Sequence, residues 1–198
     1  MKKTILKIMI LNVVLASSCW DAYYYTKVCL TETDKLVTPY KLGQTVSFID
    51  SIGNSFVLKV IKDSLFCEWL WDGYHYERKE IYLQSDKNNT FFSFNLYAPE
   101  VFPYNNSFRI NINNFIFYLS YNSEGEFFTN NLNSIYFHAS LEINNKIYYD
   151  VVECIKAEAT NKEEKKEQEC FPFRLLYNKM YGVLQLEDKE KTLFTINN

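Results

Sequence analysis

The chain has 198 residues, with 21 Lys and Arg against 24 Asp and Glu and a net charge of −3 at pH 7. This acidic balance argues against a nucleic-acid partner, because binding phosphates requires clustered cations. Aromatic residues make up 18% of the chain, whereas Gly and Pro together number nine. Such a composition, with abundant Asn, favours strands joined by short turns.

The first 18 residues have the pattern of a secretory signal. Basic residues precede an apolar run over residues 8–16, and Ala16-Ser17-Ser18 stands directly before Cys19. The apolar run is too short to span a bilayer as a lasting helix. Small residues followed by cysteine are typical of a lipobox, where cleavage leaves the cysteine first and acyl chains are attached to it. We therefore expect a removed signal peptide (1–18) and lipid attachment at Cys19.

Residues 19–38 are expected to form the acylated cysteine, a tether and a first segment, and residues 39–198 a single antiparallel β domain. Tyr23-Tyr24-Tyr25 is unusually aromatic for a free linker, so part of the tether should pack on the domain. Removing the signal leaves 18 basic against 24 acidic residues, a net charge of −6. Lipid rather than charge would then hold the protein at a membrane.

Four cysteines remain after Cys19, an even number for an oxidising compartment. Cys154 and Cys170 bracket a charged segment and form one candidate disulfide, which leaves Cys29 and Cys67 as the second. The alternative is that all four thiols are reduced. None has zinc-site spacing, so we expect no metal and no cofactor.

Turn signals predict ten to twelve strands, nearly all antiparallel, in a β-sandwich or a partly open β-barrel. The charged segment at residues 157–169 is predicted to be a solvated loop or a short surface helix. The predicted strands and hairpins, in chain order, are 44–50 with 55–62, 66–79 around Asp72-Gly73, 91–96, 108–119 around Asn113-Asn114, 135–154 around Asn144-Asn145, 173–177, and 182–187 with 192–196.

Alternation assigns an apolar face to two of these hairpins. In the hairpin at 108–119 that face holds Phe108, Ile110, Ile112, Phe115, Phe117 and Leu119. In the hairpin at 135–154 it holds Phe137, Ala139, Leu141, Ile143, Tyr148 and Val152.

The hairpin at 66–79 carries the candidate ligand-binding residues. With a two-residue Asp72-Gly73 turn, four rings share one face and could stack on a carbohydrate-like or apolar ligand: Trp69, Trp71, Tyr74 and Tyr76. The strand continues through Ile81 and Leu83, which fall on the opposite face. Either a bulge near residues 78–80 resets the alternation and buries this aromatic ladder, or the ladder faces solvent as a binding patch.

The same register places Glu68 opposite Glu77, close to the ~5 Å that separates the carboxylates of retaining glycosidases. Lys79 lies diagonally and can neutralise them, and a hairpin tip lacks the pocket that a general acid needs. His75 and His138 have no suitably spaced partner, and no known nucleophile, metal or nucleotide motif is present. We therefore expect no catalytic residue and no enzyme activity; a hydrolase is the least favoured function.

Three segments carry a family resemblance. Ala16-Ser17-Ser18-Cys19 resembles a lipoprotein signal of the Bacteroidetes type, and residues 43–56 resemble the first hairpin of small lipoproteins from that phylum. KIYYDV at 146–151 and LYNKMYGVLQL at 176–186 are similar to their closing strands. The resemblance implies an all-β lipoprotein and brings no activity. Since Trp20 rather than Asp follows Cys19, it implies the outer membrane, with the leaflet left open.

These features together predict an acylated outer-membrane lipoprotein with a non-catalytic β domain. Its expected partner is a carbohydrate-like or apolar ligand. The alternative is an accessory subunit of a membrane-associated assembly, with a protein partner.

Overall fold

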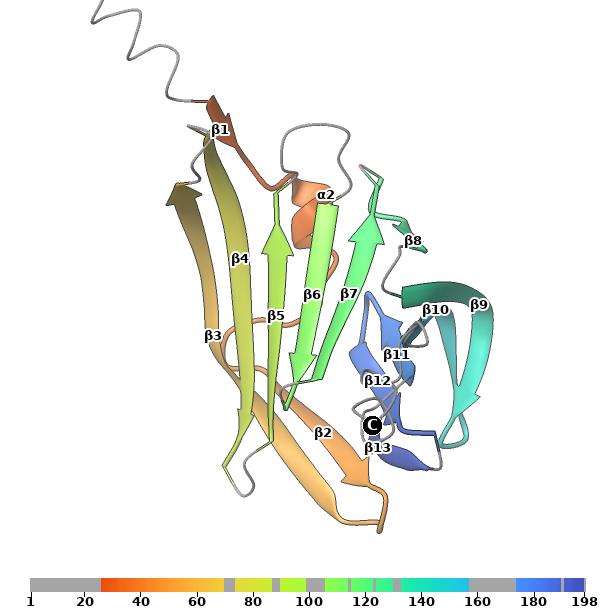
Figure 1. The fold of residues 1–198 in the computed structure, drawn as a ribbon. Helices are drawn as coiled ribbons and strands as arrows, with labels where there is room; N and C mark the ends of the chain where they lie inside the picture. Colours follow the sequence, from red (N-terminus) through yellow and green to blue (C-terminus); the bar gives the residue numbers. More distant parts are fainter. Residues whose placement is uncertain are drawn as a thin grey trace, which may run out of the picture.

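The computed structural model describes residues 26–69, 74–86, 90–98, 106–113, 115–122, 124–129, 133–156, 174–189 and 191–197. Nearly all the described elements are strands of one sheet, which confirms the all-β prediction (Figure 1). In chain order the elements are β1 (Thr26–Val28), α2 (Glu32–Lys35), β2 (Thr45–Asp50), β3 (Ser55–Trp69), β4 (Tyr74–Ser85), β5 (Phe91–Tyr97), β6 (Asn106–Ile112), β7 (Phe115–Tyr121), β8 (Phe127–Phe128), β9 (Asn133–Ile143), β10 (Lys146–Lys156), β11 (Arg174–Asn178), β12 (Gly182–Glu187) and β13 (Thr192–Ile196).

The sheet runs in the order β8-β7-β6-β5-β4-β3-β2-β13-β12-β11-β10-β9, with β1 added in parallel to β4. It curls until its two ends approach, which gives a nearly closed, barrel-like shape. Side chains bridge the seam between those ends: Asn133 Nδ2 donates to the Tyr118 carbonyl at 2.7 Å, and Ile135 N donates to Thr129 Oγ1 at 3.2 Å.

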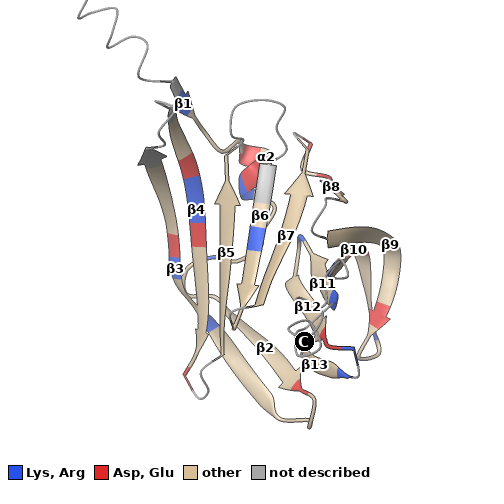
Figure 2. Cartoon of the chain, viewed as in Figure 1, with Lys and Arg blue, Asp and Glu red and all other residues tan. Residues whose placement is uncertain are grey.

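Charged residues form short bands along the strands (Figure 2).

Aromatic side chains fill the interior. Phe48, Phe92, Phe94, Phe108 and Phe127 form a continuous series in which successive ring centroids lie 5.4–6.4 Å apart. The predicted register of the β6–β7 hairpin is confirmed, since Ile112 pairs with Phe115. Its predicted apolar face is buried, apart from the half-buried Phe115. Alternation alone accounts for the core in this part of the sheet.

Part of the predicted tether packs on the domain, as expected. Leu30 and Val37 of this tether are buried in the core, together with Tyr40, which follows it. Helix α2 begins with a capping box between Thr31 and Asp34. Tyr177 Oη donates to the Val37 carbonyl at 2.6 Å. The N-terminal segment therefore contributes to the core before the chain enters β2.

The predicted register of the β3–β4 hairpin is wrong by one residue. Trp69 pairs with His75 and Cys67 with Glu77, so the connecting loop is longer than the two residues of Asp72-Gly73. A one-residue shift places positions 69 and 76 on opposite faces, and the four-ring ladder is not formed.

The predicted bulge near residues 78–80 is also absent, because β4 pairs with β3 and β5 without interruption there. The irregularity lies instead in β3, between Val60 and Lys62. Tyr76 therefore stays on the face opposite Ile81 and Leu83, and it is nevertheless only 5% exposed.

The β9–β10 hairpin has the predicted turn, with Asn144 and Asn145 at φ 50° and 59°. Those angles are the signature of a type I′ turn. The ladder is interrupted at Ala139 and Asp150, and Asp150 has a φ of 54°. Two members of the predicted apolar face, Phe137 (61%) and Ala139, are exposed. They lie in the part of the hairpin that is strongly curved (Figure 1) and form no part of the core.

The thiols of Cys29, Cys67 and Cys154 are free. The predicted Cys29–Cys67 disulfide is not formed: β1 and β3 flank β4, and strands two apart lie about 10 Å from each other, beyond the about 7 Å that a disulfide spans between Cα atoms. The predicted signal peptide, Cys19, Cys170 and the segment 157–169 lie outside the described residues. No helix in the described part of the chain is long and apolar enough to cross a bilayer.

Candidate functional site

The bend in the β9–β10 hairpin opens onto a groove. Its volume is about 970 Å³, and it is bounded by the hairpin, the β11–β12 turn and the start of β8. The hairpin lines it with residues 137–139 and 147–152, which flank the interrupted pair of Ala139 and Asp150. The interruption thus places the groove.

One asparagine fixes the shape of this region. Asn178 Nδ2 donates to the carbonyls of Tyr149 and Asp150, at 2.6 and 3.3 Å. Its Oδ1 accepts from the backbone N–H groups of Met180 and Tyr181, at 2.7 and 3.0 Å. A single side chain therefore joins the bend in β10 to the β11–β12 turn, and both of these line the groove.

The hairpin tip is fixed as well. Asn144 Nδ2 donates to the Ile196 carbonyl at 3.2 Å, and Ile143 and Tyr148 are buried. The hairpin is held at its tip and at its base and bends between them. We therefore interpret the groove as preformed.

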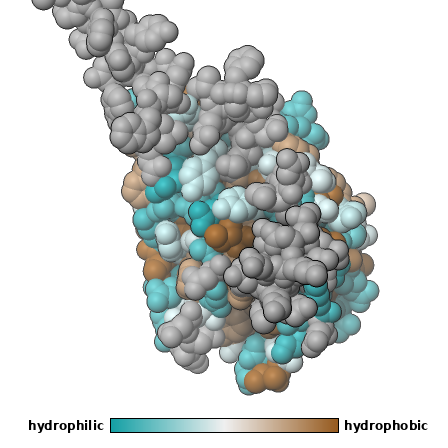
Figure 3. All heavy atoms as spheres, in the orientation of Figure 1, coloured by the Kyte–Doolittle hydropathy of each residue, from teal (hydrophilic) through white to brown (hydrophobic). Residues whose placement is uncertain are grey.

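The groove exposes large apolar side chains to water. Phe137, Ile147, Tyr149 and Met180 are 61%, 56%, 66% and 73% exposed, and all four line it. On the face drawn in Figure 3 hydrophilic and hydrophobic residues are mixed, and hydrophobic atoms also gather at the end formed by the β2–β3 turn. Clustered exposed apolar side chains mark an interaction site, unlike scattered ones.

Three exposed charged side chains stand at the edge of the groove: Glu126, Asp150 and Lys179. Lys179 Nζ donates to the Gly125 carbonyl and lies 5.4 Å from the centroid of the Phe127 ring. Burial lowers the pKa of Lys179, while the nearby carboxylates of Glu126 and Asp150 act to raise it. The edge is therefore polar while the walls are mostly apolar, as in small-molecule sites.

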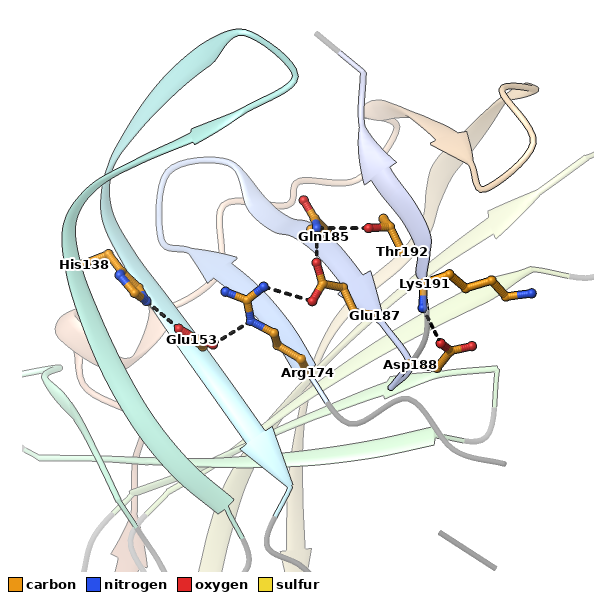
Figure 4. A network of polar contacts seen from close by, with 8 residues as sticks. All are labelled: His138, Glu153, Arg174, Gln185, Glu187, Asp188, Lys191 and Thr192. Atoms are coloured by element: carbon orange, nitrogen blue, oxygen red, sulfur yellow. Dashed lines mark hydrogen bonds and ion pairs between the residues drawn. The ribbon is translucent and has the colours of Figure 1, made fainter. Parts of the chain in front are cut away.

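A polar network begins at His138 and crosses the neighbouring strands (Figure 4). His138 Nε2 lies 2.5 Å from Glu153 Oε2, and Arg174 Nε donates to Glu153 Oε1 at 2.5 Å. Arg174 Nη1 also donates to Glu187 Oε2 at 2.9 Å. Burial on its own would raise the pKa of Glu153, but the hydrogen bonds from Arg174 and His138 lower it below its usual value. Glu153 therefore stays ionised and orients His138 at the groove.

The two strands that carry the described candidate ligand-binding residues, β3 and β4, do not line the groove. Trp71 is outside the described residues, and only the backbone is described for Trp69 and Tyr74. Tyr76 is too buried to stack on a ligand. Among the residues that the sequence singled out for a site, His138 lines the groove; a lone histidine in a strand gave no signal for that role.

Glu77 is a structural residue. It does not face Glu68, which pairs with Tyr76. Its carboxylate accepts from Lys27 Nζ at 2.6 Å and from Leu30 N at 3.1 Å. The hydrogen bond from Lys27 holds the pKa of Glu77 below its usual value against the effect of burial. Glu77 thus attaches the N-terminal segment to β4.

The arrangement at the groove is suited to binding. Its described side chains offer apolar walls, a histidine oriented by a buried carboxylate, and three charges at the edge. No cluster of three or more His, Cys, Asp or Glu side chains within the described ranges is placed to hold a metal ion.

Comparisons with protein-family models, curated proteins and solved structures give no significant match for this chain.

Proposed function

We propose that the protein is a lipid-anchored outer-membrane lipoprotein whose β domain binds a small apolar molecule in the groove beneath the β9–β10 hairpin. The observation that carries the binding proposal is the concentration of exposed Phe137, Ile147, Tyr149 and Met180 in one preformed groove. The signal-like residues 1–18 and Cys19 support the anchor.

Size and energetics favour a small ligand. A volume of about 970 Å³ lies at the upper end of small-molecule sites. Each exposed apolar side chain that a ligand covers contributes roughly 25 cal/mol per Å² removed from water. The polar edge would keep one end of the ligand in contact with solvent.

A neutral apolar fluorophore, N-phenyl-1-naphthylamine, tests the groove. It would be titrated into the full chain carrying Cys19→Ser, which has no acyl group and keeps every described residue. We expect saturable binding that Phe137→Ser and Met180→Ser each weaken about fivefold, since each removes roughly 1 kcal/mol of apolar contact.

The chain supplies matched controls. Leu42 and Ile52 are 67% and 80% exposed and lie away from the groove. Leu42→Ser and Ile52→Ser should leave the affinity unchanged. Equal affinities for all four variants would contradict the proposal. Saturable binding of an oligosaccharide panel, lost in Phe137→Ser without binding of the fluorophore, would assign the groove to a carbohydrate instead.

The anchor is tested separately. We expect the intact mass of the membrane fraction to show acyl chains on a protein that begins at Cys19. Cys19→Ala should move the protein out of the membrane fraction, because the acidic chain has no other strong attraction to a bilayer. A Cys19→Ala protein that still partitions with membranes would contradict the anchor and leave the binding proposal intact.

A further inference from the structure

The outer face of strands β3–β7 has a composition unlike that of the groove. In β5, Phe92, Phe94 and Leu96 point into the core, so the alternate residues Ser93, Asn95 and Tyr97 lie on the outer face. The register extends this face across the sheet: Glu80 and Arg109 pair with Asn95, and Tyr82 with Ser93. The result is one continuous outer surface over five strands.

Cations on this face lie against aromatic rings. Arg78 is 5.7 Å from the centroid of Phe66 and 5.9 Å from that of Tyr97. Lys62 is 4.7 Å from Phe66, and Arg109 is 5.8 Å from Tyr118. Such contacts hold long cationic side chains flat and spread them over the sheet.

Cations outnumber carboxylates among the described side chains of this face, although the whole chain is acidic. Four cations have described side chains on it: Lys59, Lys62, Arg78 and Arg109. Glu80 is the carboxylate described there, and the register also places Glu68 on this face, opposite Tyr76. Figure 2 shows basic bands on β3, β4 and β6 of this sheet.

Glu80 compensates part of this charge. It accepts from Lys62 Nζ at 2.6 Å and contacts Arg78 Nη2 at 3.0 Å. Arg109 makes no ion pair with any described residue. Its charge therefore remains available to an anion from solution.

Small polar residues form the middle of the face. Ser93 and Asn95 are 3% and 8% exposed although they point outward. They are therefore covered by neighbouring atoms, and the half-buried Tyr82, Tyr97, Arg78 and Arg109 form the accessible layer of the face. A layer of this kind suits an extended, flat ligand.

We propose that this outer face binds a linear acidic polysaccharide. Sugar rings present apolar C–H faces that stack on Tyr82, Tyr97 and Tyr118. Uronate or sulfate groups pair with Arg109 and Arg78, because the planar guanidinium matches these anions. This site is separate from the groove and does not depend on it.

Calorimetry with polygalacturonate tests the proposal. The full chain carrying Cys19→Ser should bind it with an affinity that falls as salt rises, since exposed charges are screened. Fully methyl-esterified polygalacturonate has the same backbone without the charges and should bind at least about tenfold more weakly, as expected when charge-assisted contacts are lost.

Arg109→Gln should weaken polygalacturonate binding about fivefold. It should lower the melting temperature only slightly, because the change removes the contact with the Tyr118 ring but breaks no ion pair with a described residue. The control is Lys146→Gln, which removes an exposed cation stacked on Tyr148 and Tyr181 far from this face and should leave the affinity within about twofold, the range of an uninvolved surface charge.

Three results would overturn the proposal. The first is equal binding of the charged and esterified polymers or no binding of either. The second is an Arg109→Gln protein that binds as well as the parent chain. The third is binding to phosphatidylglycerol vesicles in place of the polymer, which would assign the face to a membrane surface.

Discussion

Strands β4–β7 and the β9–β10 hairpin both alternate apolar with other residues, but they differ in how far their apolar side chains are buried. From β4 to β7 the ladders run without a register shift, and Phe108 on the inner face is fully buried. In β9–β10 the ladder is interrupted at Ala139 and Asp150, and Phe137 is 61% exposed. The comparison shows that an apolar face becomes core only where another layer covers it, and that its side chains stay exposed where it lines the groove.

The largest expected effect on stability comes from truncating a buried ring, and it tests the difference in burial between the two regions. Phe108→Ala should lower the free energy of unfolding by about 4 kcal/mol, because it leaves a cavity among packed rings. Phe137→Ala should change it by less than about 0.5 kcal/mol, as for other exposed sites. Urea unfolding of the two variants measures both values. Similar losses would mean that the hairpin covers a true core.

The contact between the N-terminal segment and β12 provides the second test. A Cβ at Gly182 would lie 2.0 Å from the Tyr40 hydroxyl oxygen, and Gly182 has a φ of 83°. Gly182→Ala should therefore cost about 3 kcal/mol, through overpacking and backbone strain together.

Gly53 is the matched control for that variant. It has a φ of 89° and open space around it, so Gly53→Ala should cost only about 1 kcal/mol. A thermal unfolding series compares the two. Equal costs would show that the contact with Tyr40 has no influence on stability.

The third test concerns the network beside the groove. Glu153→Gln should lower stability at pH 7 by about 2 kcal/mol, since a buried carboxylate loses its charged hydrogen bonds to Arg174 and His138. The pKa of Glu153 is lowered in the folded state. Its stabilisation is therefore complete above the usual Glu pKa of about 4.3 and is lost as the pH falls through the lower folded value.

Unfolding measured from pH 7 to pH 3 checks the sign. The difference between parent and Glu153→Gln should shrink as the pH falls. Glu77 also has a lowered pKa, so the Glu153→Gln chain should still lose some stability in acid. A difference that grows toward pH 3 would contradict the assignment.

The smallest effect is expected at the bend itself. The backbone of Asp150 has a left-handed conformation within a strand. In that conformation a Cβ atom costs roughly 1–2 kcal/mol of strain, which glycine avoids. Asp150→Gly should raise stability by about 0.5 kcal/mol, after the greater entropy of an unfolded glycine is subtracted. Asp150→Asn tolerates the same backbone and should leave stability unchanged. A loss of stability in Asp150→Gly, measured by urea unfolding, would show that the carboxylate rather than the backbone matters there.

The residues that the sequence placed correctly are those with strong local signals. Asn144-Asn145 identified its turn and register because both residues accept positive φ. Asp72-Gly73 was an equally clear signal, yet the β3–β4 register shifted by one residue. A dipeptide locates a turn, whereas the pairing of long strands on both sides sets the register.

The candidate site was not predictable for the same reason. Nothing local marks Asp150 as left-handed or Asn178 as the side chain that holds the bend. Their contact joins residues 28 positions apart in the chain. The sequence drew attention instead to the rings around the β3–β4 turn, because aromatic residues are conspicuous wherever they lie.

The sequence by itself determined the all-β class, most strand positions and the inner face of β6–β7, since these follow from alternation and turn chemistry between neighbouring residues. The tertiary structure decided which apolar residues are covered, where the sheet bends, and that the N-terminal segment enters the core through Tyr40 and Val37. Burial depends on what packs against a face, and that partner comes from a distant part of the chain.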